Sequence, residues 1–147
     1  MEFVSKSEKD TFVLAEKLWG EYGKFLGSKA IVFALEGEMG AGKTQFTKGL
    51  AMAMGLKDQV ISPTFVLEAE YGGGKLIHID AWRMKDEDEM KGIGFGERVN
   101  KKQVIVVEWA EKVKGVIEKL GNKVVVVWVK FEYGENINAR IVNWKIL

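Results

Sequence analysis

The sequence predicts an α/β fold of three layers, in which a mixed central sheet carries helices on both faces. Two observations lead to this fold class. Apolar runs of strand length alternate along the chain with stretches whose apolar residues recur at helical spacing. The first clear strand, residues 30–36, leads through a glycine-rich loop into a helix that begins at Lys43. This unit opens many layered α/β folds, and 147 residues is the usual size of one domain, so we expect one domain over residues 1–147.

The loop between this strand and this helix is the most informative stretch of the chain. Residues 37–44 read GEMGAGKT, a complete G-x-x-x-x-G-K-T phosphate loop. Glycine permits the positive φ angles and the close backbone approach that successive amides need to wrap a phosphate chain. The N-terminus of the following helix adds free N–H groups and partial positive charge. The sequence therefore predicts a P-loop NTPase-like domain that binds a nucleoside triphosphate.

The same loop assigns individual roles. Lys43 can reach the β- and γ-phosphates, and the Thr44 hydroxyl can ligate Mg²⁺. We expect nucleotide contacts from the whole motif and from the residue after it, namely Gly37, Glu38, Met39, Gly40, Ala41, Gly42, Lys43, Thr44 and Gln45.

Two carboxylates stand at the ends of apolar strands. Asp80 closes KLIHID, and Glu108 closes QVIVVE. Ligands of α/β folds bind outside the carboxyl ends of strands, and an acid there is the form of the second nucleotide motif, which holds Mg²⁺ or its waters. We expect Glu108 to bind the metal beside Thr44, and Asp80 to hold a metal-bound water or to orient the attacking water. Spacing alone allows the two acids to exchange these roles.

The connection after the phosphate-loop helix carries Ser62, Pro63 and Thr64. In switch-type nucleotide hydrolases this connection contains a threonine that closes on Mg²⁺ and the γ-phosphate. We expect Thr64 to act in catalysis with Lys43 and Asp80. Ser62 in the same role, and a simple turn set by Pro63, are the alternatives.

The other elements follow from apolar periodicity and turn residues. We expect helices over residues 11–22, 85–91 and 110–120, and strands over residues 65–71, 75–80, 104–108, 123–131 and 137–147. Three glycines at 72–74 predict an antiparallel hairpin, and glycines at 92, 94 and 96 predict a loose stretch. We expect His78 to be a core histidine with satisfied hydrogen bonds, and Trp82 and Trp109 to serve packing or a partner surface.

Composition excludes several classes of function. A net charge of +1 provides no strong field for nucleic acid or membranes. The absence of cysteine excludes disulfide scaffolds, thiolate zinc sites and cysteine nucleophiles. The N-terminal residues lack a signal-peptide core, and the longest apolar runs, such as 124–129, are too short to span a bilayer. We therefore expect a cytoplasmic protein without membrane association.

Four sequence blocks together resemble the TsaE (YjeE) family. They are GEMGAGKT at 37–44, SPTF at 62–65 with the later Glu70 and Tyr71, HIDAWRM at 78–84, and VEW at 107–109. The resemblance covers nearly the whole chain. The chain departs from the family pattern at Trp82, where tyrosine is common, and at Ala110, where proline is common.

The resemblance implies a small ATPase required for threonylcarbamoyladenosine synthesis on tRNA. It implies ATP and Mg²⁺ as cofactors, slow hydrolysis by the chain alone, and action with TsaD and TsaB, which modify an adenosine next to the anticodon. Hydrolysis would reset that complex between turnovers, tRNA would be met only through the complex, and self-association is left open. By position, the family's functional residues fall on Lys43, Thr44, Asp80, Glu108, Thr64 and, near the nucleotide, Thr11.

Three other functions stay open from the residues alone. A small-molecule kinase would bring an arginine-bearing lid, whereas the three arginines here, Arg83, Arg98 and Arg140, are scattered. A GTPase would need N-K-x-D after a late strand, whereas residues 100–103 read NKKQ and precede their strand. A nucleotide-gated binding module would differ from an ATPase only in that its hydrolysis is incidental.

Overall fold

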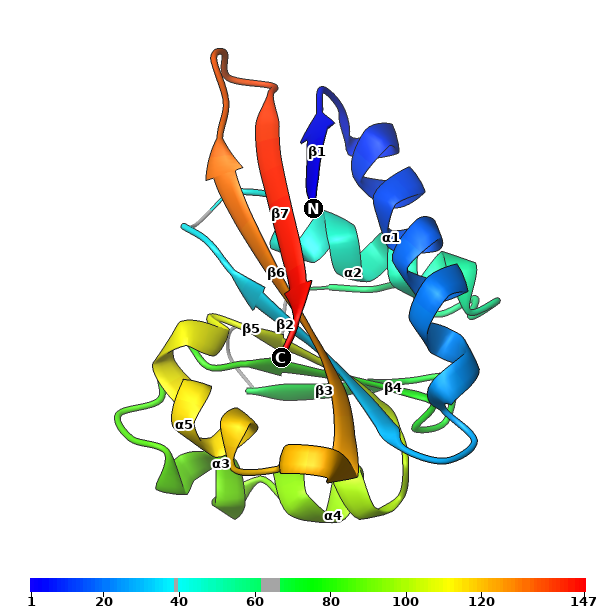
Figure 1. Ribbon diagram of the computed structural model, residues 1–147, viewed down its shortest axis with the longest axis vertical. Coiled ribbons are helices and arrows are strands. Elements are labelled where there is room, and N and C mark those ends of the chain that lie inside the picture. The colour runs from blue at the N-terminus through cyan, green and yellow to red at the C-terminus, as the bar shows by residue number, and fades with distance from the viewer. Residues whose placement is uncertain (39, 62–66) are drawn as a thin grey trace.

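The computed structural model describes residues 1–38, 40–61 and 67–147 (Figure 1). Within these residues one mixed sheet of seven strands forms the centre, in the order β1-β7-β6-β2-β5-β4-β3. The strands are β1 (Glu2–Ser5), β2 (Ala30–Glu36), β3 (Glu68–Tyr71), β4 (Leu76–Asp80), β5 (Val104–Glu108), β6 (Val124–Tyr133) and β7 (Arg140–Ile146). Strands β6, β2, β5 and β4 run parallel, and β7, β1 and β3 each pair antiparallel with a neighbour.

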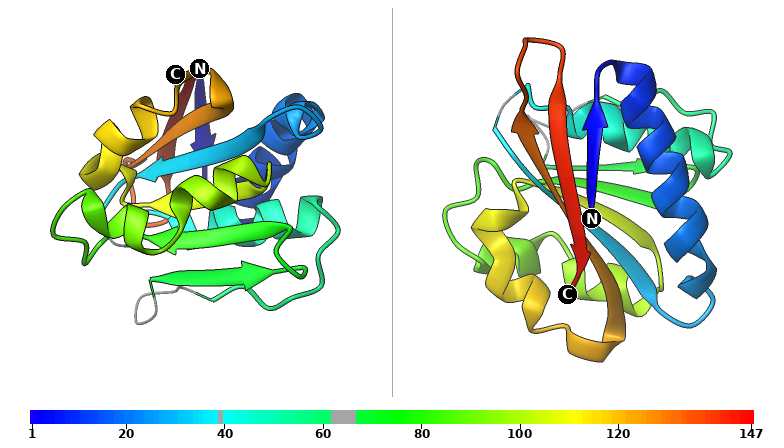
Figure 2. Two further views of the ribbon diagram at one scale, coloured as in Figure 1. Left: turned by 90° about the horizontal axis from the view of Figure 1, so that it is seen from below. Right: turned by 45° about the horizontal axis from the view of Figure 1, so that its top comes forward.

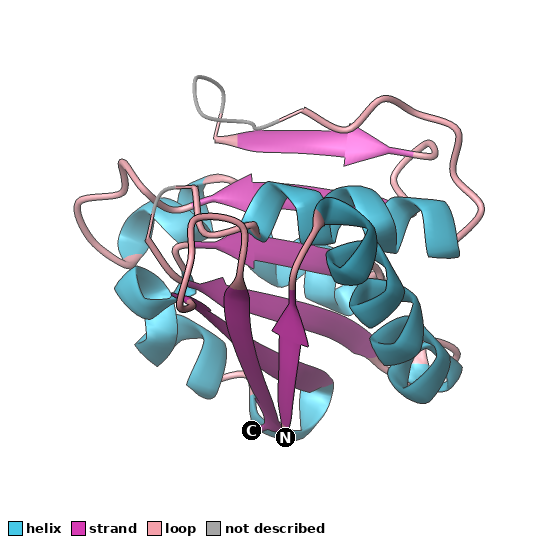
Figure 3. Cartoon of the chain, turned by 90° about the horizontal axis from the view of Figure 1, so that it is seen from above, coloured by secondary structure: helices cyan, strands magenta, loops and turns pink. Residues whose placement is uncertain are grey.

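Helices cover both faces of this sheet (Figures 1 and 3). Helices α1 (Glu8–Tyr22) and α2 (Lys43–Ala53) pack on one face, and α3 (Asp88–Gly92), α4 (Phe95–Asn100) and α5 (Lys114–Glu118) on the other. Because neighbouring strand residues point to opposite faces, β2 serves two cores. Ile31 and Phe33 join the core under α1 and α2, whereas Val32 and Ala34 join the other core. The three-layer α/β architecture is therefore confirmed.

The N-terminal segment was only partly predictable. The Ser7 hydroxyl caps α1 by accepting a hydrogen bond from the Asp10 amide at 3.2 Å, so the helix begins at Glu8 rather than at residue 11. Strand β1 was not predicted at all. Its four residues are too few to show a period, and they become a strand because they pair with β7, where Phe3 lies opposite Val142.

The N-terminus lies beside the later part of β7 at this edge of the sheet (Figure 2). The backbone amine of Met1 donates to the Trp144 carbonyl, and the Trp144 amide donates to the Met1 carbonyl, each at 3.0 Å. No helix within the described ranges is both long and apolar enough to cross a membrane.

The predicted hairpin is confirmed in its described part. β3 and β4 pair antiparallel, with Glu70 opposite Ile77, and glycines 72–74 turn the chain with φ angles of 61°, 67° and 98°. The strand predicted over residues 65–71 begins in residues 62–66, which lie outside the described ranges; its described part is β3.

Two predictions between residues 92 and 120 were wrong. The glycine-rich stretch is not loose: Gly94 adopts φ 77° and starts α4, which buries Phe95. The predicted helix over residues 110–120 is a 3₁₀ turn, Ala110–Val113, followed by the short helix α5. In both places, burial of a few apolar residues against the sheet decided the local structure.

Candidate functional site

The loop after β2 is shaped by its glycines. Gly37, Gly40 and Gly42 have φ angles of 152°, 77° and 105°, which other residues rarely adopt. A Cβ on Gly37 would also lie 2.8 Å from the Phe131 carbonyl oxygen. Helix α2 starts directly after Gly42, so its first amides face the loop without a helical carbonyl partner. These donors fit a chain of phosphates. Met39 lies outside the described residues.

Lys43 is withdrawn from water at the start of α2, with 4% of its surface exposed. Its Nζ donates to the carbonyl oxygens of Gly37 and, at 3.3 Å, of Glu38. The ring centroid of Trp109 lies 3.7 Å from the same atom. Burial lowers the pKa of Lys43, and the negative charge of Glu108 acts in the opposite direction. A buried ammonium held by loop carbonyls is a cation for which an anion would be the better partner.

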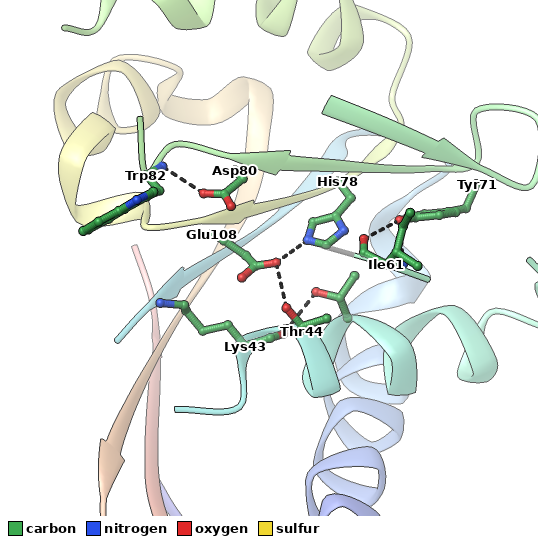
Figure 4. A network of polar contacts seen from close by, with 9 residues as sticks. Lys43, Thr44, Ile61, Tyr71, His78, Asp80, Trp82 and Glu108 are labelled. Atoms are coloured by element: carbon green, nitrogen blue, oxygen red, sulfur yellow. Dashed lines mark hydrogen bonds and ion pairs between the residues drawn. The ribbon is translucent and has the colours of Figure 1, made fainter. Parts of the chain in front are cut away.

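Thr44 and Glu108 meet beside the loop (Figure 4). The Thr44 hydroxyl donates to Glu108 Oε2 at 3.4 Å, and the same oxygen contacts Nε2 of His78. Glu108 is 4% exposed, which keeps its carboxylate away from bulk water. Mg²⁺ prefers one or two such oxygen ligands together with phosphate oxygens and waters. This pair of side chains therefore fits a magnesium ion bound with a nucleotide.

Asp80 lies next to Glu108, since the two residues are partners in the register of β4 and β5. Its Oδ1 accepts a hydrogen bond from the Trp82 amide at 2.8 Å, and 5% of the residue is exposed. Burial raises the pKa of the Asp80 carboxyl, the Trp82 amide opposes this change, and the charge of Glu108 adds to it. The two acids thus sit in different environments, and of the two it is Glu108 that accepts the Thr44 hydroxyl.

A cavity of about 430 Å³ adjoins the phosphate loop. Thr11 lines it, although it lies 26 positions before Gly37, and its Oγ1 lies 2.8 Å from Ser5 Oγ. Gly40, Gly42, Gln45, Ile137, Asn138 and Arg140 line it as well. The structure therefore brings Thr11 and the residues before β7 to the loop that the sequence singled out.

Sequence reasoning missed Arg140 as a residue of this site. Its Nη2 donates to the Gly40 carbonyl at 3.1 Å, and its guanidinium lies 4.5 Å from the Tyr133 ring centroid. A lone arginine at the start of the last strand carries no motif that could have indicated this contact.

The remaining predicted residues are distributed as follows. Thr64, Ser62 and Pro63 lie outside the described residues. Trp82 and Trp109 pack against each other with ring centroids 4.4 Å apart at 42°, and Trp109 also lies against the Lys43 ammonium. His78 is fully buried as predicted, but its Nδ1 has no hydrogen-bond partner among the described residues.

Comparisons with known proteins agree with this fold and identify a family. The family model for threonylcarbamoyl adenosine biosynthesis protein TsaE matches residues 5–140. The tRNA threonylcarbamoyladenosine biosynthesis protein TsaE of Treponema pallidum is 39% identical over 114 residues, which are 77% of this chain and 81% of the relative. The protein of the same name from Aquifex aeolicus is 42% identical over 117 residues, 77% and 79% of the two chains.

A solved structure shows the same fold. The crystal structure of YdiB from Bacillus subtilis aligns with a TM-score of 0.65 and 26% identity, over 98% of this chain and 83% of that one. The resemblance read from the four sequence blocks is therefore confirmed. With its P-loop NTPase-like α/β fold, the chain belongs to the TsaE family of threonylcarbamoyladenosine biosynthesis proteins.

Proposed function

We propose that this protein binds ATP with Mg²⁺ and hydrolyses it as an assembly factor in tRNA threonylcarbamoyladenosine synthesis. One observation carries the proposal. A glycine loop, the start of α2 and the buried Lys43 converge on one point, and Thr44 and Glu108 stand beside it. Loop amides, a lysine, a hydroxyl and a strand-end acid are the parts that phosphoryl-transfer sites need.

Each residue has a defined task in this proposal. Lys43 exchanges the carbonyls of Gly37 and Glu38 for the β- and γ-phosphates, which supply the anion that its buried ammonium lacks. Thr44 and Glu108 hold the magnesium ion, which when bound neutralises charge on those phosphates. Asp80, beside Glu108 in the register, orients the attacking water.

The rest of the nucleotide is assigned from the cavity and from the sequence. The cavity between Thr11 and Arg140 adjoins the loop and would receive the nucleoside part. Thr64 is proposed from the sequence alone to close on the γ-phosphate.

The proposed partners are the TsaB and TsaD proteins, with tRNA met only through their complex in the cytoplasm. The names of the relatives from Treponema pallidum and Aquifex aeolicus support the pathway. Hydrolysis is expected to be slow for the chain alone and faster with the pair.

The test is a measurement of ATP hydrolysis with and without the TsaB–TsaD pair, together with formation of threonylcarbamoyladenosine on tRNA. Stimulation by the pair, and loss of modified tRNA when this protein is omitted, are expected. Indifference of the hydrolysis rate to the pair would contradict the proposed partnership. Transfer of the γ-phosphate to a small molecule, seen in a coupled assay, would favour a kinase instead.

The Asp80→Asn variant separates hydrolysis from binding. A variant that binds ATP and the partners but no longer supports modification indicates that hydrolysis matters. Full support of modification by a variant that cannot hydrolyse ATP would identify a nucleotide-gated binding module.

A further inference from the structure

His78, the single histidine of the chain, is buried in the middle strand of the β5-β4-β3 group. Its Nε2 contacts Glu108 Oε2, the oxygen that also accepts the Thr44 hydroxyl. Neither the phosphate loop nor the strand-end acids require a histidine here, so its place needs a separate explanation.

The sheet register places His78 behind the acids rather than among them. It lies two residues before Asp80 on β4 and opposite Val106, which lies two residues before Glu108 on β5. Residues two apart on a strand point to the same face of the sheet, so the imidazole lies on the same face as both carboxylates. It is two residues further from the carboxyl ends of the strands. In the view of Figure 4, the Glu108 carboxylate lies between the Lys43 ammonium and the imidazole.

The contact determines which ring nitrogen carries the proton. An ionised carboxylate only accepts hydrogen bonds, so the imidazole donates to it from Nε2. The other nitrogen, Nδ1, then keeps a lone pair, in agreement with its having no partner within the described ranges. If Nδ1 carried the proton instead, a buried N–H would have no acceptor. The lone pairs of Nε2 and of Glu108 Oε2 would also face each other without a hydrogen between them.

The ring is itself held in place by the hairpin that carries it. Tyr71, on β3, packs against it with ring centroids 6.2 Å apart at 43°. The Tyr71 hydroxyl donates to the Ile61 carbonyl at 2.9 Å, and the Ile61 amide donates back at 3.3 Å. The imidazole is therefore a fixed donor, and it fixes the Glu108 carboxylate.

We propose that His78 is a positioning residue of the magnesium site. Its Nε2–H holds one carboxylate oxygen of Glu108, and so orients the carboxylate toward the point where Thr44 meets it, without touching nucleotide or metal. This inference rests on the proposed binding of ATP with Mg²⁺. Hydrogen-bonded partners of metal-ligating carboxylates tune metal affinity, and removing them costs about 10–100-fold.

Two amide variants form a matched pair for the test. The amide nitrogen of His78→Gln reaches about as far as Nε2, whereas that of His78→Asn reaches only as far as Nδ1. The Mg²⁺ concentration for half-maximal ATP binding is measured by calorimetry, and ATP affinity in EDTA is measured separately. We expect about a tenfold higher Mg²⁺ requirement for His78→Asn, a nearly native one for His78→Gln, and unchanged affinity in EDTA. Equal Mg²⁺ titrations for native protein and His78→Asn would overturn the proposal.

A second measurement uses the native protein and does not depend on the folding of a variant. Because the chain has one histidine, a ¹⁵N spectrum of histidine-labelled protein reports His78 alone. The Nε2–H tautomer, and a shift of its signals when Mg²⁺ joins bound ADP, are expected. An Nδ1–H tautomer would refute the assignment. If the native protein binds no ATP at any Mg²⁺ concentration, the proposed function itself fails. If the native protein titrates normally and His78→Asn gives the same titration, only the role proposed for His78 fails.

Discussion

The Lys43 ammonium lies 3.7 Å from the centroid of the Trp109 ring, although 66 positions separate the two residues in the chain. Trp109 follows β5 directly and adopts φ 58°, a left-handed conformation that is uncommon for a bulky residue. Such strain costs about 1–3 kcal/mol and is retained where the surrounding contacts demand it, often at functional sites. A desolvated cation over an indole contributes about 2 kcal/mol, which is of the same order. The tryptophan thus helps to hold the lysine beside the loop.

Replacing Lys43 by alanine should abolish tight ATP binding. The variant loses the only buried ammonium described at the loop, and the phosphates then face amides alone. Calorimetry with ATP and Mg²⁺ measures the affinity. Lys48→Ala, in the same helix, serves as the control and should bind normally. Unchanged affinity in Lys43→Ala would remove the lysine from the site.

The buried ammonium of Lys43 also gives a pH-dependent stability. Burial lowers the pKa of Lys43, so its charge destabilises the folded protein at neutral pH. This cost disappears as the pH rises through the pKa of the folded state and then the pKa of the unfolded state, which is about 10.4. Relative to Lys43→Met, the nucleotide-free native protein should therefore gain stability between neutral pH and pH about 10. Urea unfolding of both proteins across this range measures the difference, and a constant difference would contradict the expected burial cost.

The shift at Asp80 has the opposite sign. Burial raises the pKa of its carboxyl, so the folded state prefers the protonated acid. Stability from this preference is present below the unfolded pKa, about 3.9, and is lost as the pH rises through the folded pKa. Native protein should thus lose stability relative to Asp80→Asn over this rise in pH. The exposed Asp88→Asn is the control, and parallel profiles for native protein and Asp80→Asn would rule the effect out.

Glu108→Ala should raise the Mg²⁺ requirement for ATP binding. The variant leaves Thr44 as the one described side chain of the assigned metal pair and leaves His78 Nε2 without its acceptor. Titration of Mg²⁺ at fixed ATP measures the requirement, and thermal unfolding monitors the cost of the unpaired imidazole. Glu118→Ala, at the exposed end of α5, is the control. An identical titration for Glu108→Ala would exclude this acid as a ligand.

Gly49→Ala should destabilise the contact between α1 and α2. A Cβ at Gly49 would lie 2.8 Å from the Phe12 Cα, so two helix backbones would have to separate, at a cost of about 1–3 kcal/mol. Gly20→Ala, in α1, meets open space and should stabilise the helix by up to about 1 kcal/mol. Urea unfolding of the two variants compares them directly, and equal stabilities would show that α2 has room to move.

The phosphate loop, β2, β5 and the hairpin at residues 72–74 were predictable because each is specified by its own residues. Glycines with positive φ, a lysine–threonine pair and short apolar runs specify structure locally. Their structure can therefore be predicted without knowledge of the segments that pack against them. Helix α4, and the 3₁₀ turn and short helix α5 that follow Trp109, were not predictable from their own residues. There, burial of Phe95 and Ala110 against the sheet overrode weak local preferences.

The sequence by itself determined the α/β class, the phosphate loop and the two strand-end acids, since these depend on residue type and spacing along one stretch of chain. Only the tertiary structure decided that Trp109 lies against Lys43, that His78 contacts Glu108, and that Arg140 reaches Gly40. Contacts of this kind depend on strand register and on the packing of distant segments, and no spacing along the chain encodes them.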